Sequence, residues 1–183
     1  MHIGNEELEP IVDSLRMKEL LRSTSDKRGK IARMIHDHVA FYGGTALRIF
    51  HGLNRFSEDL DFSLVRREDD ARLEHALAES TRSSRHGGSS FDVESKSTGE
   101  RTGIESAFLK GNTRINLLSV GVPQDLARLF PHSAKVTIKL EMDTTPPPDA
   151  ATEVRTRLLP LPFQVRLYDL PSLFAGKLHA AST

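Results

Sequence analysis

Residues 43–64 read GGTALRIFHGLNRFSEDLDFSL, and this stretch decides the expected fold. The apolar run VAFY at 39–42 precedes it, and the paired glycines end that run ahead of ALRIF, which favours a helix. We therefore predict a strand, a glycine turn and a helix. Within SEDLDFSLV at 57–65, polar and apolar residues alternate from Asp59 to Leu64, which is typical of a strand with one buried face. The acids of that strand are expected on its open face.

Two of these acids, Asp59 and Asp61, are separated by a single residue. On a strand their carboxylates project from the same face, about 6.5 to 7 Å apart along the chain. Carboxylates at that separation can hold a hard cation such as Mg²⁺ or Mn²⁺. The alternative is a solvated strand face, which is the commoner explanation of an isolated Asp-x-Asp. Glu58 adds a third acid to this strand, and the resulting repulsion favours a cation or a nearby base.

A further carboxylate comes from residues 134–143, AKVTIKLEMD, which also alternate and predict a strand. Glu141 falls on the polar face of this strand. Two-metal phosphoryl-transfer sites need three acids to hold the ions and to activate an attacking hydroxyl, so Glu141 is a candidate third ligand. The alternative is an exposed strand residue paired with Lys139.

Gly43 and Gly44 allow the backbone to approach a ligand, and the helix that follows directs unpaired amides at an anion. A phosphate would fit there. The alternative is a plain strand-to-helix turn with Thr45 as the N-cap. Arg55 and Ser57 precede the acids in the connecting loop, where they could contact the phosphates of a nucleotide or could only brace the loop.

Lys177 belongs to a helix predicted at 170–181, LPSLFAGKLHAA. It lies one turn beyond Leu173 and Phe174, at the edge of an apolar stripe. Lysines in such positions usually extend into solvent. At the rim of an anionic cleft, Lys177 would instead stabilise a leaving pyrophosphate. A working site requires this helix to fold back beside Thr45.

The remaining residues alternate between helical and strand-like patterns, without an internal repeat. We predict helices at 5–23, 26–38, 68–80 and 123–129, a mobile loop at 82–90, and strands at 91–97, 106–110 and 114–120 that form a meander. Prolines after residue 143 end the strand before them. These elements predict an α+β (mixed α/β) fold, in which helices flank a mixed β-sheet.

Composition limits the class of protein. The chain has 183 residues, of which 38% are hydrophobic and 27% charged, as in one globular domain with a core. Basic and acidic residues balance to zero net charge, so any contact with nucleic acid must be a local patch. Cysteine is absent, which excludes disulfides, thiolate metal sites and thiol nucleophiles. The first residues lack a signal-peptide pattern and no apolar run reaches membrane-spanning length, so we expect a soluble cytoplasmic protein with no membrane partner.

The run at 43–64 resembles the signature of the AbiEii/AbiGii-type nucleotidyltransferase toxins, a bacterial family within the polymerase-beta-like nucleotidyltransferases that includes the MenT toxins. The family pattern is Gly-Gly-Thr/Ser, a helix, then Arg-x-Ser-x-Asp-Leu-Asp-Phe, and the chain matches it without a gap. Two weaker matches follow in the expected order, a Lys-x-Glu strand at VTIKLEM and a lysine helix at LFAGKLHA. The resemblance spans about residues 30 to 180.

This resemblance implies a nucleotidyltransferase-fold sheet, an NTP substrate with Mg²⁺ or Mn²⁺, and transfer of a nucleoside monophosphate to RNA, such as the 3′ end of tRNA. It implies the toxin of a toxin–antitoxin or abortive-infection system, with a cognate antitoxin as partner. Asp59 and Asp61 would ligate the metal, Glu141 would be the third acid, and Lys177 would be catalytic. The implied nucleotide-binding residues are Gly43, Gly44, Thr45, Arg55 and Ser57.

Members of this family continue past the lysine helix, through an arginine and an Arg-Asp-x-x-Asp segment, into a helical C-terminal region. The expected organisation is therefore an N-terminal helix at 1–25 and a nucleotidyltransferase core at 26–183 that lacks this segment. Two alternatives remain open. A small-molecule acceptor, as in antibiotic-modifying nucleotidyltransferases, is favoured by the zero net charge, and a non-catalytic remnant that binds NTP or an antitoxin is favoured by the missing segment.

Overall fold

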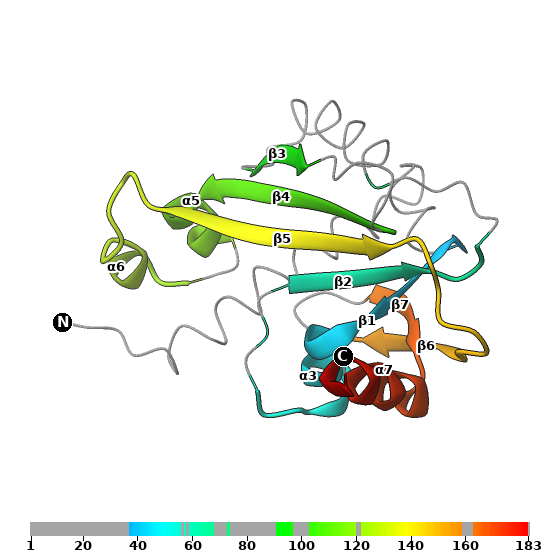
Figure 1. Cartoon of the computed structure of the whole chain (residues 1–183). Helices are drawn as coiled ribbons and strands as arrows, with labels where there is room; N and C mark the ends of the chain where they lie inside the picture. The colour runs from blue at the N-terminus through cyan, green and yellow to red at the C-terminus, as the bar shows by residue number, and fades with distance from the viewer. Residues whose placement is uncertain are drawn as a thin grey trace.

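The chain folds around a mixed β-sheet, seen in a computed structural model (Figure 1). The structure describes residues 37–55, 57, 59–67, 73, 91–96, 103–119, 122–158 and 163–182. The strands are β1 (Val39–Tyr42), β2 (Asp59–Leu64), β3 (Phe91–Lys96), β4 (Ile104–Asn112), β5 (Lys135–Asp143), β6 (Thr152–Arg157) and β7 (Phe163–Tyr168). The helices of the described segments are α3 (Gly43–His51), α5 (Thr113–Ser119), α6 (Gln124–Ala127) and α7 (Leu170–Ser182).

Within the described segments the sheet has seven strands, in the spatial order β3-β4-β5-β2-β1-β7-β6. The central strand β2 is antiparallel to β1 and parallel to β5. β1 is also parallel to β7, whereas the pairs β3–β4, β4–β5 and β6–β7 are antiparallel. The sheet is thus mixed and has helices packed against it, which confirms the predicted fold class.

Alternation along the strands separates a core face from an open face. In β2 and β5 the apolar residues of the alternating pattern are buried, namely Leu60, Phe62, Leu64, Ile138, Leu140 and Met142. Ser63, on the face of the acids, is buried as well, where its hydroxyl accepts a hydrogen bond of 3.0 Å from the hydroxyl of Tyr168. The ring of Phe41 in β1 contacts that of Phe50 in α3 with 6.3 Å between centroids, so α3 packs on this core. α7 packs on α3 in turn (Figure 1). The acids of β2 and β5 consequently lie on the other face.

Residues 114–119 belong to the helix α5, so the strand predicted at 114–120 is wrong over the residues that the structure describes. Asn112, the last residue of β4, directly precedes α5, and its Oδ1 accepts a hydrogen bond of 3.2 Å from the backbone N–H of Ile115, in the manner of a helix N-cap. Leu117 is buried against Ala127 of α6. A short apolar run has no period that separates a strand from a helix, and here the cap and the packing on α6 favour the helix. The meander therefore runs through β3, β4 and β5, with α5 and α6 between the last two strands.

Two strands were absent from the sequence prediction. β6, with the sequence TEVRTR, lies at the edge of the sheet and offers one apolar residue, Val154, which is exposed. β7, with the sequence FQVRLY, does alternate, and its Val165 and Leu167 are buried. An edge strand needs no apolar face, so periodicity alone does not reveal it.

Several predicted elements fall outside the described residues. These are the N-terminal helix, the loop at 82–90, and most of the helices at 26–38 and 68–80. From the last of these helices Leu73 is described, and it is helical and buried. The described segments contain no helix with the length and apolar character that crossing a membrane requires.

Candidate active site

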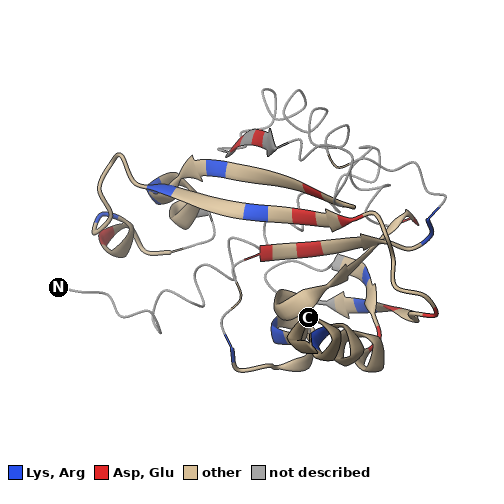
Figure 2. Ribbon diagram, viewed as in Figure 1, with Lys and Arg blue, Asp and Glu red and all other residues tan. Residues whose placement is uncertain are grey.

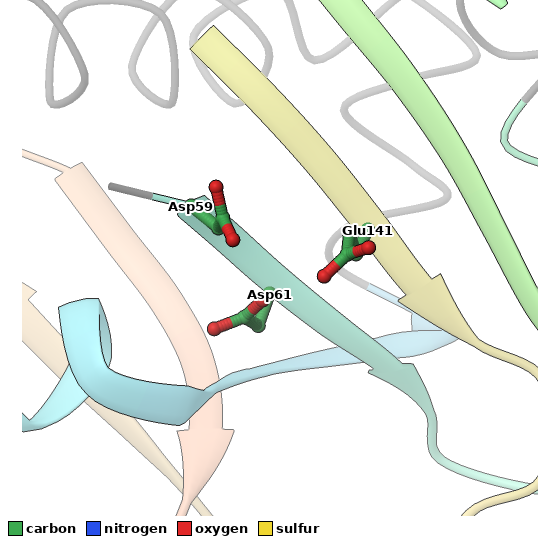
Figure 3. Close-up of side chains that lie close together, drawn as sticks. All are labelled: Asp59, Asp61 and Glu141. Atoms are coloured by element: carbon green, nitrogen blue, oxygen red, sulfur yellow. The ribbon is translucent and has the colours of Figure 1, made fainter. Parts of the chain in front are cut away.

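Three carboxylates meet on the open face of the sheet. The parallel register of β2 and β5 pairs Asp61 with Glu141 and Asp59 with Lys139. Paired residues of neighbouring strands point to the same face, so Glu141 lies beside both aspartates. One carboxylate oxygen from each of the three acids lies within 4.8 Å of the other two (Figure 3). The structure therefore brings together the three residues that the sequence predicts as metal ligands.

The environment of Asp61 is unfavourable for a third negative charge. Burial, followed by the charges of Asp59 and Glu141, raises the pKa of Asp61 to about 6, while the ammonium groups of Lys177 and Lys139 act in the opposite direction. The carboxylates of Asp59 and Glu141 remain partly open to solvent, with exposed fractions of 36% and 27%. A cation could thus reach the cluster, and its charge would relieve the repulsion.

Lys139 lies in the same cluster, next to the acids along β5. Its Nζ is 2.7 Å from Oε1 of Glu141 and 3.7 Å from Oδ2 of Asp59. The hydrogen bond to Glu141, and to a smaller extent the charge of Asp59, raises the pKa of Lys139. Figure 2 shows blue and red bands along β5 next to red bands on β2, so basic and acidic residues are close together on these two strands. Glu141 is therefore both a member of the acidic cluster and the partner of Lys139, which the sequence left as alternatives.

The paired glycines allow α3 to begin directly against the acids. Gly43 has a φ of +79°, and a Cβ on it would clash with Oδ2 of Asp61 and lie 2.8 Å from its Cγ. A Cβ on Gly44 would lie 2.6 Å from Oγ of Ser57 and 3.6 Å from Nζ of Lys177. Side chains at these two positions would thus displace groups of the site. The N-terminus of α3, with its unpaired amides, consequently lies beside Asp61.

Thr45 is not the N-cap that the sequence suggests. α3 begins at Gly43, and its N-cap is Tyr42, which makes no side-chain capping bond. The Thr45 side chain is fully buried, and its hydroxyl donates a hydrogen bond of 2.6 Å to the backbone carbonyl of Asp59. Since that hydroxyl ties α3 to the start of β2, a contact of Thr45 with phosphate would have to come from its backbone amide.

Ser57 and Arg55, the two candidate residues of the loop before β2, differ in how close they lie to the site. Ser57 packs its side chain against the backbone of Gly44, beside the N-terminus of α3. Arg55 is exposed in the same loop, and within the described part of the chain no ion pair joins its guanidinium group to the three acids. Ser57 is therefore the better placed of the two for a ligand at the helix terminus.

Lys177 reaches the site from the far end of the chain. α7 packs on α3, and Nζ of Lys177 lies close to Gly44, where its charge acts on Asp61. The helix thus folds back as predicted. Only one side of the expected apolar stripe is buried, however, because Leu173 is 4% exposed and Phe174 is 50% exposed. Lys177 is itself an exposed residue, so a ligand can reach its ammonium group.

Sequence reasoning missed three groups that border the cluster. Lys139 was considered only as a surface partner, and the strand register is what places it beside Asp59. Ser106 of β4 donates a hydrogen bond of 3.3 Å to Oε1 of Glu141. Tyr42 pairs with Asp61 across β1 and β2, and burial, followed by the charge of Asp61, raises its pKa. Alternation indicates the face of each residue, but not which residues of other strands lie beside it.

A mixed sheet with two aspartates on one strand, a glutamate on the next and a glycine-led helix beside them agrees with the nucleotidyltransferase fold expected from the sequence. The family model described as "Nucleotidyl transferase AbiEii toxin, Type IV TA system" matches residues 32–183, and the chain belongs to this family. No curated protein matches the chain.

Two solved structures from Helicobacter pylori are similar to this one. JHP933 is 18% identical, with a TM-score of 0.50, over 97% of this chain and 58% of the other. A structure described as a "putative nucleotidyltransferase" is also 18% identical, with a TM-score of 0.51, over 96% of this chain and 59% of the other. At this identity the similarity concerns the fold alone. The chain spans less than two thirds of the length of either structure.

Proposed function

We propose that the chain forms the core of a metal-dependent nucleotidyltransferase, which transfers a nucleoside monophosphate from an NTP to an acceptor and releases pyrophosphate. The observation that carries this proposal is the meeting of three carboxylates, within 4.8 Å, beside the N-terminus of α3 and the ammonium group of Lys177. The cluster unites acidic groups for a cation with positive groups for a phosphate.

The donor set of the cluster fits a hard divalent cation. Asp59, Asp61 and Glu141 offer carboxylate oxygens from two adjacent strands, and oxygen donors of this kind suit Mg²⁺ or Mn²⁺ rather than softer metals. These three residues would hold the ion, which when bound neutralises charge on the phosphates. The raised pKa of Asp61 supports the assignment, because a carboxyl group surrounded by like charges gains from a cation.

The other residues of the site would bind and orient the triphosphate. Gly43 and Gly44 place the backbone amides of the first turn of α3 beside the acids, and Ser57 adds a hydroxyl next to Gly44. Lys177 would stabilise the charge that develops on the leaving pyrophosphate. Arg55 would reach the nucleotide from the loop. In this assignment the buried hydroxyl of Thr45 holds α3 against β2.

We further propose that the acceptor is RNA, with the 3′ end of tRNA as the first candidate, and that the protein acts as a toxin opposed by a cognate antitoxin in the cytoplasm. Family membership supports the toxin assignment. The zero net charge favours a second candidate, a small-molecule acceptor, because a dedicated RNA-binding protein usually has an extended basic surface.

The test is a transfer assay with each α-labelled NTP, Mg²⁺ or Mn²⁺, and total tRNA. We expect label to appear in tRNA with the unmodified chain and to be lost with Asp61→Asn. Asp92→Asn, an exposed carboxylate on β3, is the matched control and should retain transfer. Label in an added aminoglycoside but not in tRNA would favour the small-molecule acceptor. Binding of NTP without transfer to any acceptor would contradict the enzymatic proposal.

A further inference from the structure

We propose that Lys139 is the built-in counter-ion of the acidic cluster, and that a divalent cation binds by displacing its ammonium group from Glu141. This inference rests on the proposed function, since it assumes that Asp59, Asp61 and Glu141 bind the cation. Lys139 would act as a positioning residue that sets the affinity of the site for metal. Its effect would be to weaken cation binding while stabilising the cation-free protein.

The position of Lys139 follows from strand register rather than from a chance surface contact. Lys139 and Glu141 are two apart on β5, so they share a face, and the parallel pairing places Lys139 directly beside Asp59. Its Nζ contacts Oε1 of Glu141 at 2.7 Å and lies 3.7 Å from Oδ2 of Asp59. One ammonium group therefore bridges two of the three carboxylates, and it does so across two strands.

The two lysines approach the acids from different elements, and the charges of both act on Asp61. Lys177 approaches from α7, and its charge acts on Asp61 beside Gly44. Lys139 approaches from β5, on the side of Asp59 and Glu141. A cation among the three acids would share Oε1 of Glu141 with the ammonium group of Lys139, and like charges at ligand distance repel strongly. The ammonium group of Lys139 must therefore move when the cation binds.

Two features lower the free-energy cost of moving the Lys139 ammonium group away from Glu141. The side chain of Lys139 is 34% exposed, and its flexible four-carbon stem can carry the ammonium group into solvent. Ser106 donates a second hydrogen bond to the same oxygen, Oε1 of Glu141, at 3.3 Å. Because Ser106 lies on β4, it can hold the Glu141 side chain in place after Lys139 leaves.

The experiment is a titration of the full chain with Mn²⁺ alone, in which the paramagnetic resonance signal of free Mn²⁺ gives the affinity. We expect Lys139→Met to bind Mn²⁺ roughly three- to tenfold more tightly than the unmodified chain, as the loss of two half-exposed ion pairs implies. Without Mn²⁺, the melting temperature of this variant should be lower. Lys139→Gln provides a second neutral side chain, and Lys139→Arg, which keeps the charge, should restore the original affinity to within about threefold.

Lys110→Met is the matched control, because Lys110 also forms an ion pair on the sheet, with Glu94, but lies outside the cluster. Its Mn²⁺ affinity should stay unchanged. Equal or weaker Mn²⁺ binding by folded Lys139→Met and Lys139→Gln, with binding by the unmodified chain intact, would overturn the role of Lys139 alone. If neither the unmodified chain nor the neutral variants bind Mn²⁺, the metal site of the proposed function fails as well.

Discussion

Asp61 gives the stability of the cation-free protein a specific dependence on pH. Its pKa is about 6 in the folded protein and 3.8 in an unperturbed carboxyl group. Between these two values the folded state binds more protons than the unfolded state, so the free energy of unfolding decreases as the pH rises from about 4 to 6. Above pH 6 the carboxylate of Asp61 is charged in the folded protein, and the free energy of unfolding stays lowered by the full amount. A bound cation would offset it.

We therefore predict that Asp61→Asn removes this decrease, and that at pH 7.5 without metal it raises the free energy of unfolding by on the order of 2 kcal/mol. Denaturant unfolding between pH 4 and 8 measures this directly. Asp92→Asn should leave the pH profile as it is. If the free energy of unfolding of Asp61→Asn still decreased between pH 4 and 6 as steeply as that of the unmodified chain, the electrostatic account of the cluster would be contradicted.

Gly43 and Gly52 allow a matched comparison, because both have positive φ values, +79° and +69°. A Cβ at Gly52 meets nothing within 4 Å, whereas a Cβ at Gly43 meets the Asp61 carboxylate. Gly52→Ala should cost only the backbone strain, about 1 kcal/mol. We predict that Gly43→Ala costs at least about 2 kcal/mol more and weakens Mn²⁺ binding, as measured by unfolding and by metal titration. Equal costs for the two substitutions would show that Asp61 does not require glycine at position 43.

At the scale of elements, α3 and β2 are joined by the Thr45 hydroxyl, which bonds to the Asp59 carbonyl in the interior. Thr45→Val keeps the shape of the side chain but leaves this carbonyl without its donor. We predict a loss of about 1 to 2 kcal/mol in the free energy of unfolding, and Thr45→Ser should retain most of the stability. Equal stability of the valine and threonine proteins would contradict a structural role for this hydroxyl.

Elements with a strong period could be predicted from the sequence, and the others could not. β2 and β5 alternate over a full buried face, and their acids accordingly fall on the predicted side. α5 was mistaken for a strand because its cap and its contact with Ala127 are tertiary features. β6 was missed because an edge strand such as TEVRTR needs few apolar residues. The place of Lys139 in the site depends on register, which no single strand encodes.

At the scale of the whole molecule, the site depends on the return of α7 to α3. Lys177 comes from the last described helix, more than a hundred residues after Asp61, yet its charge acts on that acid. We predict that Lys177→Ala lowers transfer at least about 100-fold while NTP affinity changes less than about threefold, because the ammonium group would act mainly in the transition state. Lys135→Ala, an exposed lysine on β5, is the control. Equal losses of NTP affinity and transfer would make Lys177 a ground-state anchor instead.

The central claim is that β2 and β5 build a cation-dependent nucleotide site, and calorimetric titration of the full chain with each NTP tests it most directly. With Mg²⁺ present we predict binding of at least one NTP, which EDTA abolishes, which Asp61→Asn reduces at least about tenfold, and which Asp92→Asn preserves. NTP binding of the same affinity in EDTA and in Mg²⁺, or binding that Asp61→Asn leaves unchanged, would contradict the claim.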